Sequence, residues 1–270
     1  MLLSPDSTCL DCAGSTHPGL VRDNNEDAHC ILVGDANQQG ILAMVADGVG
    51  GHRSGEVASA LAVETVRNSF LTWDGSSSDG FVTRALREAN RAVMNAASRS
   101  DDDFNMQTTA TAVMVTGDRL SAAHVGDCRL YRLRDGTLDL LTRDHTMTMD
   151  LVRLHVISPE QALTHPARSQ LTRSIGFDDL VQVDSVRDQV RKGDVYLLCS
   201  DGLWSEVPPE NLRKAAARSS AEEACSLLIE EALAVGAHDN VTAVVLRVLA
   251  VVESAPSASR WRSLLRRVPS

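Results

Sequence analysis

The sequence predicts a layered α+β domain, because strand-like and helix-like segments are grouped along the chain and do not alternate strictly. Two helical stretches come in succession: apolar residues recur at helical spacing in Glu56–Phe70 and again near Phe81–Ala97, with a Ser, Gly and Asp cluster at Asp74–Gly80 between them. A block of short β-branched segments follows. Later strands are again followed by two helices, so sheets and helices should form separate layers.

The expected strands are short apolar or alternating runs that end at turn-forming residues. In chain order they are Ile41–Ala46, Thr108–Val115, Arg119–Val125, Arg129–Leu133, Thr137–Leu141, Val181–Val186, Val195–Cys199 and Val241–Val251. The four segments in the middle of the chain are separated by Gly-Asp or Asp-Gly pairs, which predicts an antiparallel meander. Further helices are expected at Met147–His155, after an N-cap at Ser158-Pro159, and at Glu210–Ala217 and Ala221–Val235.

The composition of the chain argues against several classes of function. The chain has 270 residues, of which 43% are hydrophobic, enough for a sizeable core, and only 3% are aromatic. The formal net charge is −10, and the domain has no basic patch with interleaved aromatics, so nucleic acid is not an expected partner. No apolar run reaches transmembrane length, and the first residues, MLLSPDSTCLDC, are not typical of a secretory signal.

The six cysteines lie far apart except for the first pair, unlike those of a secreted disulfide scaffold, so we expect a reducing cytoplasm. The pair Cys9-x-x-Cys12 invites a zinc or redox interpretation. No second ligand pair is spaced to complete a structural zinc site. We therefore interpret it as an incidental pair on a mobile N-terminal extension, residues 1–13.

Five short segments place acidic residues where the backbone must turn. They are Arg22–Asp27, Asp47–His52, Gly126-Asp127, Ser200–Gly202 and Asp239-Asn240. Three of them lie beside expected strand ends, where carboxylates can converge on one rim of a sheet. A single Asp-Gly pair indicates only a turn, but the whole set indicates a shared site.

Six longer segments resemble, in order and spacing, those of the metal-dependent protein phosphatases, the type 2C serine/threonine phosphatases, and above all their bacterial members. The segments are Val21–Ala28, Val45–Ser59, Thr108–Val115, Ala123–Gly136, Leu197–Trp204 and Asp239–Leu246. The resemblance covers roughly residues 14 to 250. It implies a phosphatase domain over residues 14–252 and a four-layer α-β-β-α sandwich, with two antiparallel sheets flanked by helices.

The resemblance also implies a metal site. Asp47 would bridge two metal ions, and the carbonyl of Gly48 would be a further ligand. Asp201 and Asp239 would complete the shell of one ion, and Glu26 would serve the other.

Three further roles follow from the same resemblance. Arg22 would bind the substrate phosphate, Asp27 would act near the second metal through water, and Asp127, with Asp201, would hold a third, weaker ion. Taken alone, Arg22 would instead be expected to form a surface ion pair with Glu26, four residues on.

The residue types favour this chemistry independently. Carboxylate and carbonyl oxygens are hard ligands, and no Cys or His stands at a matching position, which favours Mg²⁺ or Mn²⁺ over zinc or copper. Two such ions about 3.5–4 Å apart can share and activate a water for in-line displacement. The planar guanidinium of Arg22 suits a phosphate because it can make two parallel hydrogen bonds.

Two positions depart from the family pattern. Animal-type relatives have a histidine two residues after the bridging aspartate, proposed as the acid that protonates the leaving group, and here that residue is Val49. His52 lies close by, but we expect it to stabilise the turn. Cys128 stands where the family usually has serine, and we expect its small thiol to pack without a redox role.

Residues 143–176 correspond to the family's flap beside the active site, and their polar composition suits a mobile loop. Their histidines, His145, His155 and His165, are not spaced as ligands and are expected to be exposed.

The composition shifts in the tail, residues 253–270, which holds four arginines against one glutamate. Trp261, Leu264, Leu265 and Val268 would share one face of a short basic amphipathic helix that could dock on a membrane surface or a partner. Such a short helix is marginal alone, so a disordered tail is favoured.

We therefore expect hydrolysis of phosphoserine or phosphothreonine on proteins, with a metal-activated water and without a phosphoenzyme. The expected cofactors are two Mn²⁺ or Mg²⁺ ions and a third more weakly held. Phosphorylated proteins are the expected partners, among them a serine/threonine kinase and its substrates, and we expect a cytoplasmic monomer.

Two other functions are alternatives for this chain. A binding module without turnover should lack metal ligands, and none is missing. A phosphatase of small molecules stays open, because only substrate comparison separates it from a protein phosphatase.

Overall fold

The computed structural model describes residues 8–34, 40–49, 53–75, 78, 80–99 and 106–252. The basic tail and His52 lie outside these residues, so what the sequence predicts for them stays a prediction. In the described part of the chain, no helix has the length and apolar character needed to cross a bilayer.

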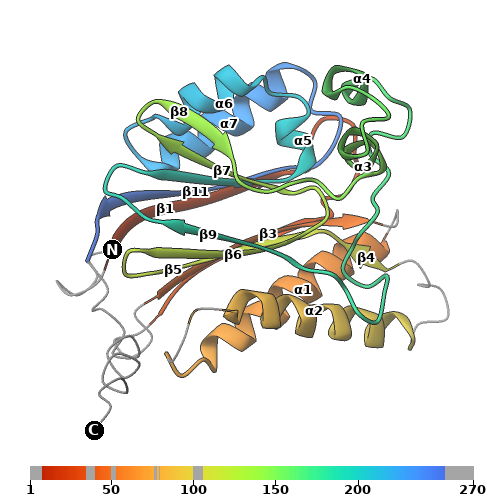
Figure 1. Ribbon diagram of the computed structural model, residues 1–270, viewed down its shortest axis with the longest axis horizontal. Helices are drawn as coiled ribbons and strands as arrows, with labels where there is room; N and C mark the ends of the chain where they lie inside the picture. Colours follow the sequence, from red (N-terminus) through yellow and green to blue (C-terminus); the bar gives the residue numbers. More distant parts are fainter. Residues whose placement is uncertain are drawn as a thin grey trace, which may run out of the picture.

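Two antiparallel sheets form the centre of the molecule (Figure 1). One has the strand order β1-β11-β10-β7-β8, with the strands Cys9–His17, Val241–Ala250, Val195–Cys199, Arg129–Arg134 and Thr137–Leu140. The other has the order β2-β3-β5-β6-β9, with the strands Asp27–Val33, Gly40–Val49, Ala110–Thr116, Arg119–Val125 and Asp184–Gln189. The short β4, Gln107–Thr108, pairs with the end of β3. We call these the β10 sheet and the β3 sheet.

Helices cover the outer face of each sheet (Figure 1). α1 (Arg53–Leu71) and α2 (Phe81–Ala97) pack on the β3 sheet, whereas α6 (Pro209–Ala216) and α7 (Ala221–Ala234) pack on the β10 sheet. Buried apolar side chains fill three layers, one between the two sheets and one between each sheet and its helices. This arrangement confirms the predicted four-layer α-β-β-α sandwich.

Local sequence signals place several elements well. α2 has the predicted bounds because its apolar residues, from Phe81 to Val93, recur on one buried face. The short helix α4 (Pro159–Leu163) begins at the predicted cap: the N–H of Gln161 donates to the Ser158 hydroxyl, and the N–H of Ser158 donates to the Gln161 side chain. α3 (Met147–Arg153) begins after Thr146.

The predicted four-strand meander is wrong at its centre. β5 pairs with β6 and β7 pairs with β8, but β6 and β7 belong to different sheets. The chain passes from one sheet to the other at Gly126, which has a φ of 101°, and a Cβ there would lie 2.5 Å from Thr109. Glycine adopts this conformation without strain. A Gly-Asp pair can form a hairpin turn within one sheet or a connection between two sheets. The dipeptide alone therefore does not predict which of these connections occurs.

The N-terminal prediction is also corrected. β1 begins at Cys9 and pairs along its length with β11, the last strand, so residues 9–13 belong to the sheet and not to an extension. Such a pairing joins the two ends of the described chain and leaves no local signal in the sequence. Cys9 and Cys12 are free, and no group of three His, Cys, Asp or Glu among the described residues includes them in a metal site.

Candidate functional site

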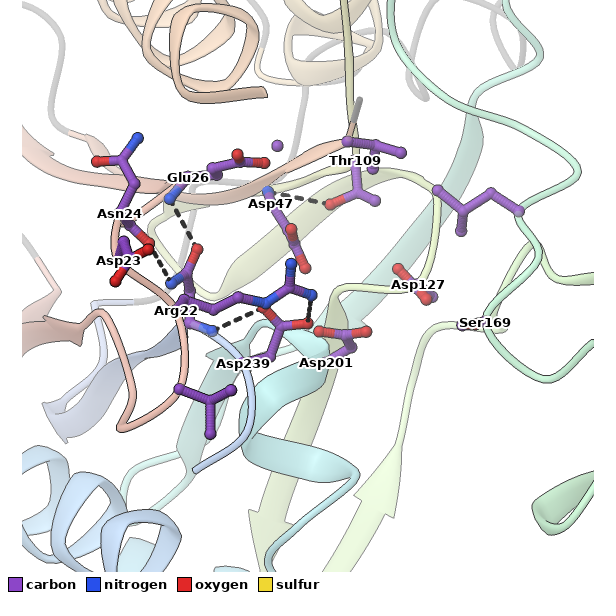
Figure 2. Close-up of a pocket in the computed structure, with 15 residues that line it drawn as sticks. Arg22, Asp23, Asn24, Glu26, Asp47, Thr109, Asp127, Ser169, Asp201 and Asp239 are labelled. Carbon is purple, nitrogen blue, oxygen red and sulfur yellow. Dashed lines mark hydrogen bonds and ion pairs between the residues drawn. The ribbon is translucent and has the colours of Figure 1, made fainter. Parts of the chain in front are cut away.

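Acidic side chains meet at one end of the sandwich because several elements begin or end there. Asp47 lies near the end of β3, Asp127 follows β6, and Asp201 opens the short helix α5 (Asp201–Trp204) directly after β10. They face a cavity of about 680 Å³ (Figure 2). Its lining includes the predicted residues Arg22, Glu26, Asp47, Gly48, Asp127, Asp201 and Asp239.

The backbone of Asp47 is fixed by Thr108 of β4 and by Thr109, the residue between β4 and β5. Its N–H donates to the hydroxyl of Thr109 at 3.1 Å, and its carbonyl accepts from the N–H of Thr109 at 2.8 Å. The Thr108 hydroxyl donates to the same carbonyl at 2.8 Å. These contacts hold the end of β3 rigid where the Asp47 side chain enters the cavity.

Glu26 is placed by contacts to its main chain. The N–H of Gly48 donates to its carbonyl at 3.1 Å, and so does the hydroxyl of Ser59 at 2.6 Å. A Cβ on Gly48 would collide with the carbonyl of Gly55 and come within 2.8 Å of the Glu26 carbonyl. The three segments approach this closely only because residue 48 is glycine.

Arg22 stands at the mouth of the cavity and points at Asp239 (Figure 2). Its Nη2 donates to Asp239 Oδ2 at 2.8 Å, and this hydrogen bond is the main cause that raises the pKa of Arg22. The two side chains are 56% and 40% exposed, so solvent screens the pair and an arriving phosphate can reach the guanidinium. Its ion-pair partner is therefore Asp239, from the far end of the chain. The local spacing alone suggests Glu26 instead.

Asp27 lies behind the cavity wall, opposite Asp47 in the pairing of β2 with β3. Its Oδ2 accepts from the hydroxyls of Ser200 at 2.7 Å and Thr242 at 2.6 Å. Its Oδ1 is buried without a hydrogen-bond partner among the described residues. Burial raises the pKa of Asp27 to about 7, although the two hydroxyls act in the opposite direction. An acceptor buried in this way costs about 1–3 kcal/mol unless something binds it.

The carboxyl groups that face the cavity repel one another. The pKa values of Asp47, Asp127 and Asp201 are all raised, first by burial and then by neighbouring carboxylates. A hydrogen bond shared between Asp47 and Asp201 acts in the opposite direction on Asp201. This surplus of negative charge is unfavourable in a low-dielectric cleft, and bound cations would remove that penalty.

The donor set fits hard divalent cations. It consists of carboxylate oxygens and the carbonyl of Gly48, which favours Mg²⁺ or Mn²⁺. Over the described ranges, no three Asp, Glu, His or Cys side chains form a group that could hold a metal ion as they stand. The carboxylates are spread over the walls of the cavity, so the fit rests on three observations: their oxygen chemistry, their mutual repulsion and the unpaired acceptor of Asp27.

The two departures from the family pattern lie close to this cavity. Val49 is part of its lining and has no proton to donate. Cys128 is fully buried, with its sulfur 3.0 Å from the hydroxyl of Thr109. Burial raises the pKa of the Cys128 thiol, which disfavours the reactive thiolate, in agreement with a packing role.

One expectation for the flap is wrong. His145 is only 3% exposed. The N–H of Gly126 donates to its Nδ1 at 3.0 Å, and its Nε2 lies 3.2 Å from Asp184 Oδ2. His155 is exposed as expected, and His165 is half-buried. A polar composition over the whole segment does not reveal that its first residues pack into the fold.

Asn240 is a site residue whose role the sequence did not indicate. Its Oδ1 accepts from the N–H of Glu26 at 2.7 Å, and its Nδ2 donates to the carbonyls of Pro18 and Asn24, both at 2.8 Å. One buried amide thereby holds the loop that carries Arg22 and Glu26. The available signal was an Asp-Asn pair directly before a strand, which fits a turn equally well.

Comparisons with known proteins agree with this geometry. The family model described as Protein phosphatase 2C matches residues 21–240. A serine/threonine protein phosphatase PstP of Mycobacterium tuberculosis is 38% identical over 240 residues, which are 89% of this chain but 45% of that relative. The chain thus spans less than half the length of that relative. A serine/threonine phosphatase stp of Listeria welshimeri is 33% identical over 84% of this chain and 91% of its own length.

Solved structures show the same likeness. A crystal structure of the M. tuberculosis phosphatase PstP/Ppp is 37% identical with a TM-score of 0.81, over 89% of this chain and 99% of that one. The PstP catalytic domain in complex with two manganese ions is 36% identical with a TM-score of 0.79, over 89% of this chain and 99% of its own. The Staphylococcus aureus phosphatase Stp1 has a TM-score of 0.84 at 28% identity, over 93% and 99% of the two chains.

Proposed function

The chain belongs to the protein phosphatase 2C family, and from this premise we propose that it hydrolyses phosphoserine and phosphothreonine on proteins with the help of divalent metal ions. The observation that carries the proposal is the composition of the cavity. Carboxylates from distant parts of the chain line it and outnumber the cationic side chains among its described lining residues, and an accessible arginine stands at its mouth. This arrangement suits the binding of cations inside and of a phosphate ester above them.

The acidic residues of the cavity would bind the metal ions. Asp47, Asp201, Asp239 and Glu26, with the carbonyl of Gly48, would hold two Mn²⁺ or Mg²⁺ ions. When bound, such ions supply a nucleophile by lowering the pKa of water and stabilise charge on the phosphoryl group. The related PstP catalytic domain forms a complex with two manganese ions, which supports this number.

Other side chains would act on the substrate and on the surroundings of the ions. Arg22 would exchange its contact with Asp239 for a two-pronged contact with the phosphate, because both partners are accessible at the mouth. Asp27 would act on one ion through water, with its unpaired Oδ1 as the acceptor. Asp127, with Asp201, would hold a third ion. Val49 has no proton to give and would not act as the acid for the leaving alkoxide.

Partners and location form part of the same proposal. The substrates would be phosphorylated proteins, including a serine/threonine kinase and the proteins it modifies. The enzyme would act as a cytoplasmic monomer, and the six free cysteines support a reducing compartment.

The test is release of phosphate from a phosphothreonine peptide, with Mn²⁺ and with a chelator. We expect turnover only with Mn²⁺, and a loss of at least about 100-fold in Asp47→Asn and Asp201→Asn, because each removes one negative ligand and keeps the side-chain shape. The matched control is Asp135→Asn, in an exposed turn at φ 51°, a conformation that asparagine tolerates. It should retain wild-type turnover.

Two outcomes would contradict the proposal. Equal rates in the wild type and in both cavity variants would exclude a role for the carboxylates, and turnover in chelator would exclude the metal. Comparison of the peptide with a small phosphomonoester identifies the substrate class: a large preference for the small ester would replace a protein phosphatase with a small-molecule phosphatase.

A further inference from the structure

The turn that carries Asp127 is held from two sides. On one side the N–H of His145 donates to the carbonyl of Gly126 at 2.7 Å, and the N–H of Gly126 donates to His145 Nδ1 at 3.0 Å. On the other side the indole N–H of Trp204 donates to the carbonyl of Asp127 at 2.9 Å. The main-chain position of Asp127 is therefore set by two residues outside the turn.

Trp204 is the last residue of α5, and Asp201 is the first. One turn of helix consequently supplies both a cavity carboxylate and the donor that holds the Asp127 backbone. The two carboxylates proposed for the third ion, Asp127 and Asp201, are thus tied together through one indole ring.

The orientation of that ring is fixed by Arg129. The guanidinium carbon lies 3.5 Å from the centroid of the Trp204 ring, a cation–π contact. The same guanidinium is held in its plane by Asp144: Nε donates to Oδ1 at 3.0 Å and Nη2 to Oδ2 at 2.7 Å. Nη1 donates to the hydroxyl of Tyr131 at 2.9 Å. Because hydrogen bonds hold the planar guanidinium of Arg129 along its edges, it has one orientation, and its face stays against the indole ring of Trp204.

The chain of contacts also reaches the flap. Asp144 and His145 are adjacent residues at the start of the flap segment, and both side chains are buried. One holds Arg129 and the other holds Gly126. The same network of contacts therefore holds both the base of the flap and the turn that carries Asp127.

We propose that Trp204 and Arg129 are positioning residues that hold the Asp127 carboxylate where the third, weaker divalent cation binds. The inference rests on the proposed function, since it takes the cavity as a site for divalent cations. Neither side chain is among the described residues that line the cavity, so both act through Asp127. They set the affinity for the third ion and leave the ligands of the other two in place.

The variant that isolates this effect is Trp204→Phe. Phenylalanine keeps an aromatic face for Arg129 but removes the N–H that holds the Asp127 carbonyl. Arg129→Lys keeps the charge and loses the planar fork. Trp73→Phe is the matched control, because Trp73 packs with Phe70 and Phe81 in the helix layer, outside the cavity lining.

The measurement is calorimetric titration of Mn²⁺ into the metal-free protein. In the wild type we expect two stronger sites and one weaker site, and Asp127→Asn should abolish the weaker one. Trp204→Phe should weaken the third site by about 3- to 10-fold, the effect of one lost hydrogen bond. Arg129→Lys should also weaken it, because the indole ring is then no longer held in one orientation. The two stronger sites should bind as in the wild type. Trp73→Phe should match the wild type at all three.

A second comparison separates positioning from a general structural role. In the Asp127→Asn background, Trp204→Phe should cause no further change in Mn²⁺ binding, because its effect passes through Asp127. The inference is overturned if Trp204→Phe binds the third ion like the wild type, if it weakens all sites in proportion, or if Asp127→Asn retains the weaker site. A wild type that binds Mn²⁺ in this way but releases no phosphate would overturn the proposed activity and leave the positioning intact.

Discussion

The two ends of the β-sandwich both bury carboxylates, but they neutralise them in different ways. Strand β10 shows this directly, since Asp194 precedes it and Asp201 follows it. At the Asp194 end, arginines of β7 cross to the acids: Arg134 binds Asp194 at 2.7 Å, and Arg132 binds Asp188 at 3.0 Å. Both acids, the buried Asp194 and the partly buried Asp188, therefore have an arginine of the protein as counter-charge.

In the part of the chain that the structure describes, the carboxylates at the Asp201 end are not matched one to one by arginines. Arg129, on the same strand as Arg132 and Arg134, is bound by Asp144, and among the described residues Arg22 forms its ion pair with Asp239 at the mouth. Burial, and after it the neighbouring carboxylates, raise the pKa values of Asp47 and Asp201 instead. A buried acid with an arginine partner indicates a structural ion pair, whereas buried acids without one indicate a site for external cations.

The largest effect on stability is expected at the balanced end. Asp194 is 2% exposed and accepts from Arg134, from the N–H of Arg191 at 2.7 Å and from the hydroxyl of Tyr196 at 3.3 Å. Asp194→Asn removes the buried counter-charge that Arg134 contacts at 2.7 Å and leaves it, among the described residues, only the longer ion pair with Asp188 at 3.4 Å. The substitution should lower the free energy of unfolding by about 3 kcal/mol in urea denaturation. Asp139→Asn is the control, because Asp139 is 42% exposed and its pair with Arg132 is screened. Equal losses of stability in Asp194→Asn and Asp139→Asn would contradict the difference expected between a buried and an exposed ion pair.

A smaller, pH-dependent effect is expected from His124, beneath the cavity end. It lies between the Thr111 hydroxyl at 2.8 Å and the Arg143 carbonyl at 3.1 Å. Burial, with repulsion from His145, lowers the pKa of His124 to about 3. An unfolded histidine titrates near 6.5, so acid protonates the unfolded chain first and the free energy of unfolding falls by about 1.4 kcal/mol per pH unit below that value.

This prediction is checked by denaturation of the wild type and of His124→Asn between pH 7 and pH 5. The wild type should lose its stability more steeply than the variant as the pH falls, because only the wild type carries the buried imidazole. Parallel curves would mean that His124 takes up a proton in the folded protein. The cavity carboxyls act in the opposite direction, since their raised pKa values let the folded state bind protons first, and both proteins share that contribution.

The contrast between local and non-local signals explains what the sequence could predict. The bounds of α2 and of strand β10 match because periodicity and turn residues are local. The pairing of β1 with β11 and the passage of the chain between sheets at Gly126 depend on packing between distant segments. The candidate site shows the same division: the acidic residues were marked by their motifs, whereas the amide of Asn240 and the buried imidazole of His145 act through contacts that no motif encodes.

The measurement that tests the central claim most directly compares the unfolding temperatures of the wild type and Asp47→Asn, in chelator and in Mn²⁺. In chelator the variant should be the more stable, by about 1 kcal/mol, because it relieves the repulsion at Asp47. In Mn²⁺ the order should reverse, because cation binding stabilises only a chain that holds the ions. Destabilisation by Asp47→Asn in chelator, or an unchanged order in Mn²⁺, would contradict the account.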